Sequence, residues 1–135
     1  MTRLYADSAF YVALIHPQDP LARAAQRLSK LIGRDEIVTS DPVITVVLNY
    51  FSGRNTYLRS LANQFAHAMR ADPRTTIIEQ TRELFDAGLK LYAARPDKGY
   101  SHTDCMSMVI CQEQGIELVL THDRHFTQEG LEILL

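Results

Sequence analysis

Short apolar runs alternate with helix-like segments along the whole chain, and this alternation constrains the fold more than any other feature. Strands are expected at 3–6, 37–39, 75–78, 118–121 and 131–135. Segments with helical periodicity lie between them, at 8–15, 21–32, 41–51, 56–71, 81–94 and 101–114. Strands that alternate with helices indicate a parallel sheet covered by helices on both faces. We therefore predict an α/β fold with a mainly parallel central sheet of four or five strands.

Helix and strand signals compete in one segment. Residues 43–47 read Val-Ile-Thr-Val-Val, and propensity alone favours a strand for such a β-branched run. Asp41-Pro42, however, is a helix-start signal, with Asp41 as the cap and Pro42 at the first helical position. Because residues 48–51 continue the helical pattern, we predict a helix here.

The bulk composition limits the class of protein. A chain of 135 residues predicts one domain, residues 1–135. The net charge of −2 excludes a basic nucleic-acid coat but not an RNA substrate, which responds to the local field. Cys105 and Cys111 would lie about 9 Å apart along a helix, too far for a disulfide. With no long apolar run and no signal-peptide pattern, we expect a cytoplasmic protein that does not enter membranes.

Three aspartates fall where strands end or helices begin. Asp7 and Asp123 follow apolar strand-like runs, in RLYADS and LVLTHD, and Asp104 opens a helix in YSHTDCMSM. The carboxyl ends of parallel strands meet at one crevice, so these carboxylates are expected to converge there. Such a cluster binds hard divalent cations, which can promote phosphodiester cleavage.

Each aspartate also has an ordinary structural explanation. Asp7 could cap the first helix. Asp104 completes the capping box Ser101-His-Thr-Asp104, and Asp123 could close a turn. Three independent caps need not converge, whereas three acids at one sheet edge do, so convergence in space separates the two interpretations.

Four segments carry a wider likeness: LYADSAF, TSDPVITVVLNYF, DKGYSHTDCMSM and THDRHF, in this order along the chain. Together they resemble the PIN-domain family, especially the VapC-type toxins of toxin–antitoxin pairs. The resemblance implies a single PIN-like domain over 1–135 that acts as an endoribonuclease with Mg²⁺ or Mn²⁺. It also implies an RNA substrate, a small cognate antitoxin whose tail fills the acidic groove, and a homodimer.

The same resemblance assigns roles to individual residues. Asp7 matches the first acid of the family, Asp104 the third and Asp123 the fourth, so all three are expected catalytic residues and metal ligands. Ser8 and Thr121 match hydroxyl residues that flank the site and orient a water or a phosphate oxygen.

The chain departs from the family at the second acid. Counting from Thr39-Ser40, the position usually held by Glu is Val46. Three explanations remain open: an engineered change that disarms a toxin, a natural change that weakens or abolishes activity, or a substitute role for the nearby Asp41. With three acids, the charge suffices for one well-held ion. We therefore expect a weakened or inactive ribonuclease.

Two other functions compete. A receiver-like phosphoacceptor domain needs an acidic pair near the first strand, an Asp ending a middle strand and a late Lys. Here the 75–78 strand ends in Glu79, and no Lys follows Thr121. The second alternative is a catalytically dead PIN-like module that binds an antitoxin or RNA, for which metal binding would be unimportant.

Histidines lie near two of the acids in sequence, at positions 102, 122 and 125. Their spacing fits no known ligand pattern, and neighbours along a strand point to opposite faces. A mixed His/Asp site for a transition metal is therefore not expected.

Overall fold

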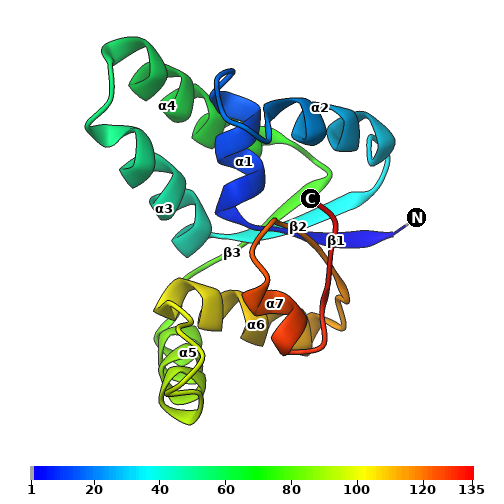
Figure 1. Cartoon of the computed structure of the whole chain (residues 1–135), viewed down its shortest axis with the longest axis vertical. Helices are drawn as coiled ribbons and strands as arrows, with labels where there is room; N and C mark the ends of the chain where they lie inside the picture. The colour runs from blue at the N-terminus through cyan, green and yellow to red at the C-terminus, as the bar shows by residue number, and fades with distance from the viewer. Residues whose placement is uncertain (1) are drawn as a thin grey trace.

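A computed structural model describes residues 2–135. Five parallel strands form its sheet, in the order β3-β2-β1-β4-β5 (Figure 1). The strands are β1 (Arg3–Ala6), β2 (Glu36–Ser40), β3 (Thr75–Ile78), β4 (Leu118–Leu120) and β5 (Glu132–Ile133). The predicted parallel sheet is thus confirmed. The last strand is shorter than the predicted 131–135.

Helices cover both faces of the sheet, as predicted. They are α1 (Ser8–Ile15), α2 (Ala22–Leu31), α3 (Asp41–Ser52), α4 (Thr56–Ala71), α5 (Arg82–Ala94), α6 (His102–Gln114) and α7 (His125–Gln128). The first four group together on one side, and α5 to α7 lie on the other (Figure 1). None of the helices in residues 2–135 combines the length and apolar character needed to cross a membrane.

The strand order places a topological switch between β1 and β4. The chain moves from β1 outward through β2 to β3, then returns through α5 and α6 to pair β4 with the free side of β1. Ala6 pairs with Leu120 in this register, so the residues that follow the two strands emerge side by side. Open parallel sheets place their ligand sites at such a point, outside the carboxyl ends of the strands.

The β-branched run after β2 forms α3, as predicted, but its cap differs. Ser40 is the N-cap, and its Oγ accepts a hydrogen bond from the Val43 amide at 3.3 Å. Asp41 is instead the first helical residue. Val43, Val47 and Phe51 lie on one helix face and are fully buried. Tertiary packing of that face outweighs the weak strand propensity of the run.

The core contains polar hydroxyls as well as apolar side chains. The Tyr5 hydroxyl lies 3.1 Å from Ser40 Oγ and 2.7 Å from Ser107 Oγ, all within the buried interior. Cys105 and Cys111 are both free and buried, in agreement with the spacing argument.

Candidate metal centre

Asp7 lies at the switch point, and its side chain does not make the usual capping bond of the first helix. It occupies the N-cap position of α1 with extended backbone angles, yet makes no side-chain capping bond. Its Oδ2 instead accepts a hydrogen bond from the Thr121 hydroxyl at 2.8 Å, across the gap between β1 and β4. The simple capping explanation for Asp7 therefore fails.

Thr121 links two of the three acids. Its Oγ1 donates to Asp7 and accepts from the Asp123 amide at 3.1 Å. Thr121 is fully buried, so its hydroxyl is occupied in holding the acids. Ser8, in contrast, is half-buried at the start of α1.

Asp104 caps its helix and also reaches the cluster. Ser101 Oγ accepts from the Asp104 amide at 3.0 Å, and Asp104 Oδ2 accepts from the Ser101 amide at 3.1 Å, as in the predicted capping box. The same Oδ2 lies 3.4 Å from Nδ1 of His125. Asp104 can therefore cap α6 and also belong to the acidic cluster. Its bond to the Ser101 amide holds the carboxylate on the side of α7.

Asp123 and His125 complete a compact group. Asp123 Oδ1 accepts from the His125 amide at 2.9 Å, the turn-closing bond expected for this residue, and lies 3.3 Å from His125 Nδ1. One ligand atom each from Asp104, Asp123 and His125 lies within 4.8 Å of the others. This is the one set of three or more metal-ligating residues so placed among residues 2–135.

Burial and the neighbouring carboxylates raise the proton affinity of Asp7. Burial raises the pKa of Asp7 to about 6; the hydrogen bond from Thr121 opposes this shift, and the nearby charges of Asp104 and Asp123 add to it. Asp7 is 4% exposed. Within the described residues 2–135, no Lys or Arg forms an ion pair with any of the three.

The donor set fits a divalent cation. Three carboxylates lie near one another without a Lys or Arg partner, and a cation would offset both their repulsion and the desolvation of Asp7. Asp104 and Asp123 are partly exposed, with 14% and 34% of their side-chain surface accessible, so an ion can reach them from solvent.

The structure does not bring Asp41 into this group. Asp41 is exposed and lines a surface hollow with Arg70, Thr75, Ile77 and Glu79, beside the outer strand β3. The site of the three acids lies beyond β1 and β4, so Asp41 is a poor substitute for a missing fourth acid.

Val46 lies on the flank of the buried face of α3. It is half-buried and is not among the apolar side chains of residues 2–135 that pack on the core. Its neighbour Val47, by comparison, is fully buried in that core. A side chain at position 46 is thus not required for core packing.

His125 is the residue that sequence reasoning missed. His102 bonds the Phe85 carbonyl between α5 and α6, and His122 faces the Leu135 carbonyl, both away from the acids. His125 lies beside Asp104 and Asp123 because residues 125–128 form the one-turn helix α7 and do not continue strand β4. The argument from strand alternation therefore did not apply to it.

A charged pair joins the end of α7 to the loop between α5 and α6. The Arg95 guanidinium donates to Glu129 at 3.0 Å and 3.3 Å, and the Tyr100 hydroxyl donates to the same carboxylate at 2.9 Å. The hydrogen bond from Arg95 lowers the pKa of Glu129, so the pair stays ionised. The Tyr100 ring also packs against His125, with centroids 5.3 Å apart.

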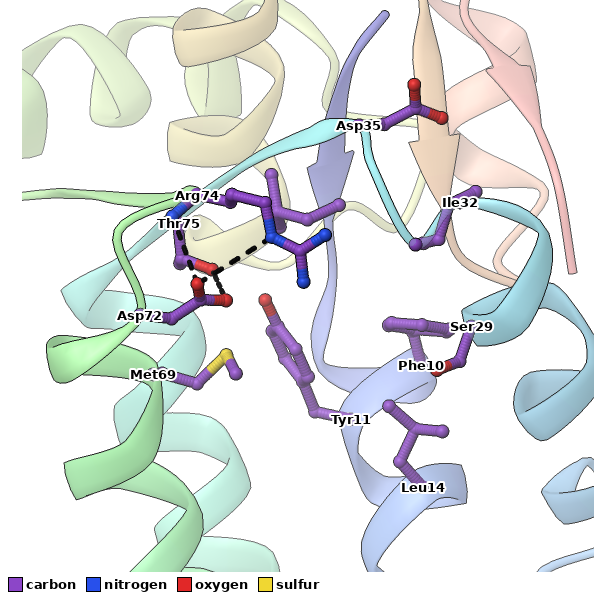
Figure 2. Close-up of a pocket in the computed structure, with 12 residues that line it drawn as sticks. Phe10, Tyr11, Leu14, Ser29, Ile32, Asp35, Met69, Asp72, Arg74 and Thr75 are labelled. Atoms are coloured by element: carbon purple, nitrogen blue, oxygen red, sulfur yellow. Dashed lines mark hydrogen bonds and ion pairs between the residues drawn. The ribbon is translucent and has the colours of Figure 1, made fainter.

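A cavity of about 130 Å³ lies elsewhere, over the amino-terminal ends of β2 and β3. Figure 2 shows Tyr11 extending from α1 into it, toward Asp72 and Arg74. Asp72 is engaged locally, since it accepts from the Arg74 amide and the Thr75 hydroxyl. Within residues 2–135 this cavity holds no set of metal-ligating side chains. It lies at the amino-terminal ends of the strands, whereas Asp7 and Asp123 follow their carboxyl-terminal ends.

Comparison with known proteins identifies the family of this chain. The PIN domain family matches residues 4–129, nearly the whole chain. The chain belongs to the PIN domain family. The resemblance in the four sequence segments is thereby confirmed, and so is the PIN-like fold.

Two solved structures have a similar fold. The chain is similar to the Mycobacterium tuberculosis toxin VapC20, described as cleaving the sarcin-ricin loop, with a TM-score of 0.85, 20% identity and 95% of each chain covered. It is also similar to FitAcB from Neisseria gonorrhoeae, with a TM-score of 0.67, 16% identity, and 98% of this chain and 96% of that chain covered. No curated protein matches the sequence.

Proposed function

We propose that this PIN domain protein is a metal-dependent endoribonuclease, the toxin of a type II toxin–antitoxin pair, with activity weakened or lost because Val46 occupies the usual Glu position. The observation that carries the proposal is the convergence of Asp7, Asp104 and Asp123 at the switch point between β1 and β4. Single helix caps would not require this convergence.

Each residue has a role in the proposed site. Asp7, Asp104 and Asp123 would hold Mg²⁺ or Mn²⁺, with Asp104 and Asp123 on the partly exposed side and Asp7 on the buried side. Thr121 positions Asp7 and the Asp123 backbone, while half-buried Ser8 is the hydroxyl available to a phosphate oxygen or water.

The reaction is an in-line displacement at phosphorus. When bound, a divalent cation supplies positive charge that stabilises the attacking and departing oxygens. A water would attack opposite the departing oxygen and give up a proton to solvent. One P–O bond forms while the other breaks, and the departing ribose oxygen takes up a proton from solvent. No side chain forms a covalent intermediate. With a cation bound, the acids would orient the phosphate and the attacking water relative to each other.

The change at position 46 reduces the charge available to a second ion. Four carboxylates balance two doubly charged cations, whereas three balance one and leave another poorly ligated. Since α3 contacts α6, a Glu at position 46 would return a carboxylate to the α3 side of the crevice. This is the reason for expecting a weakened enzyme rather than an unfolded one.

An alternative is a catalytically dead module that binds an antitoxin or RNA. The absence of the fourth acid favours it, and metal affinity discriminates between the two proposals. In the first proposal the protein partner is a small cognate antitoxin and the protein forms a homodimer; in the alternative the partner is an antitoxin or RNA.

An RNA-cleavage assay with Mg²⁺ or Mn²⁺ tests the proposal on three chains: the protein as written, Val46→Glu and Val46→Gln. We expect Val46→Glu to raise cleavage by orders of magnitude. Val46→Gln, which matches Glu in size but lacks its charge, should not raise it. The double variant Val46→Glu/Asp123→Asn should return to the starting level.

Two outcomes would contradict parts of the proposal. Equal cleavage by the protein as written and by Val46→Glu would remove the role of position 46. Cleavage that survives EDTA would remove the metal. Mn²⁺ should also raise the Tm of the protein as written, and Asp7→Asn should reduce that gain, because a cation relieves the carboxylate repulsion.

A further inference from the structure

We infer that His125 is a metal ligand, so that Asp104, Asp123 and His125 form a mixed oxygen and nitrogen site that prefers Zn²⁺ and Mn²⁺ to Mg²⁺. The inference rests on the proposed metal site and deepens it, because the acids alone would select a hard, oxygen-loving cation. Imidazole suits first-row transition ions, whereas Mg²⁺ takes oxygen ligands and retains its waters.

The geometry of the imidazole supports ligation. His125 Nδ1 lies 3.4 Å from Asp104 Oδ2 and 3.3 Å from Asp123 Oδ1. Two ligand atoms bound about 2.1 Å from a tetrahedral ion are about 3.4 Å apart. Both contacts are also longer than the 2.7 to 3.2 Å that N–H···O hydrogen bonds usually span. His125 Nδ1 is thus separated from each of the two oxygens by the distance expected between two ligands of one ion, and the three ligand atoms lie within 4.8 Å of one another.

Contacts of both the backbone and the ring fix the position of His125. The His125 amide donates to Asp123 Oδ1 at 2.9 Å, which fixes the start of α7. Phe126, the next residue, is fully buried and anchors the helix in the core. The Tyr100 ring packs on the imidazole, and Gly99 lies on the side of Nε2, where an added Cβ would be 3.9 Å away.

Val46 makes the nitrogen ligand more important. With an apolar residue at that position, the partly exposed donor atoms are two carboxylates and one imidazole, and the third carboxylate, Asp7, is buried behind them. The site has lost a hard anionic oxygen and kept a softer nitrogen, which shifts its preference along the divalent series toward Zn²⁺.

The test measures metal affinity and coordination rather than activity. Calorimetric titration of the purified protein with Mg²⁺, Mn²⁺ and Zn²⁺ should give the affinity order Zn²⁺, then Mn²⁺, then Mg²⁺. His125→Asp creates an all-oxygen set and should lower Zn²⁺ affinity at least about tenfold while strengthening Mg²⁺. His122→Asn, a change at a histidine that faces away from the acids, is the matched control and should leave both affinities unchanged.

A spectroscopic readout identifies the nitrogen directly. Electron spin echo modulation of bound Mn²⁺ should show coupling to ¹⁴N in the protein as written and in His122→Asn, and none in His125→Asp. If the coupling is absent, or if His125→Asp leaves the Zn²⁺ to Mg²⁺ ratio unchanged, the inference is overturned while the proposed metal site stands. If none of the three ions binds the protein as written, the metal-dependent function fails as well.

Discussion

The hydroxyl of Thr121 donates a hydrogen bond to Oδ2 of Asp7 across 2.8 Å, joining residues from opposite ends of the chain. The bond bridges β1 and β4 at the switch point of the sheet, where both residues are buried. It is the interaction that turns an ordinary helix-cap position into part of an acidic site.

Replacing Thr121 by Val should destabilise the fold by about 1 to 3 kcal/mol, because the buried Asp7 carboxylate and the Asp123 amide both lose their partner. The loss should be larger above pH 6, where Asp7 is ionised and the bond is charge-assisted. Urea unfolding at pH 4.5 and pH 7.5 measures both quantities. Thr121→Ser retains the hydroxyl and should lose less; an equal loss would show that the methyl group, not the hydrogen bond, matters.

The free energy of unfolding should fall as pH rises from about 4 to about 6, in the absence of metal. Burial raises the pKa of Asp7 to about 6, whereas an unfolded Asp titrates near 3.9. The folded state therefore holds more protons in this window, and stability declines with pH until Asp7 is ionised in both states. The decline from this group is on the order of 3 kcal/mol.

Asp7→Asn removes the titrating group and should flatten this part of the pH profile. Unfolding in urea with EDTA, at pH values from 4 to 7.5, compares the two chains. A profile of equal slope in both would contradict the raised pKa of Asp7 in the folded protein.

Two buried tyrosines should respond in opposite ways to loss of the hydroxyl. Tyr5→Phe should cost about 1 to 2 kcal/mol, since Ser40 and Ser107 lose a buried partner. Tyr11 is as deeply buried, but its hydroxyl makes no hydrogen bond among residues 2–135. Burial raises the pKa of Tyr11. The nearby Thr39 hydroxyl is used elsewhere, because it donates to the Ala6 carbonyl at 2.8 Å.

Tyr11→Phe should therefore leave stability unchanged or raise it slightly. Thermal and urea unfolding of both variants, measured side by side, test the contrast. A loss for Tyr11→Phe as large as that for Tyr5→Phe would mean that the Tyr11 hydroxyl has a partner, such as water in the adjacent cavity.

Gly88 permits the close approach of α5 to α6. A Cβ there would lie 2.6 Å from Cγ of Met106 and 3.2 Å from the Met106 amide nitrogen. Gly88→Ala should destabilise the protein by about 1 to 3 kcal/mol through overpacking, despite the higher helix propensity of alanine. Gly53→Ala is the matched control, because its φ is −98° and no atom lies within 4 Å of the added Cβ. If Gly53→Ala destabilised the protein and Gly88→Ala did not, this account would be contradicted.

Much of the fold could be predicted from local signals. The capping box Ser101 to Asp104 is formed as its spacing indicates, and Gly115 ends α6 in the left-handed conformation. The exchange of cap from Asp41 to Ser40 is a shift of one residue, because both side chains can accept from a helix amide.

Parts of the site could not be predicted, since they depend on contacts between distant residues. Asp7 had the sequence environment of a helix cap, and only its neighbour across the sheet, Thr121, shows that its carboxylate points elsewhere. His125 had no recognisable ligand spacing, because the one-turn helix α7 sets its direction.

The sequence by itself determined the order of strands and helices, their approximate ends and the three places where acids meet strand or helix termini. These features follow from backbone propensity, side-chain periodicity and capping, which act over a few residues. Only the tertiary structure decided that Asp104, Asp123 and His125 face one another, and that Asp41 does not join them. Such a convergence depends on the strand order and on the packing of α6 and α7, and both arise from burial between segments far apart in the chain.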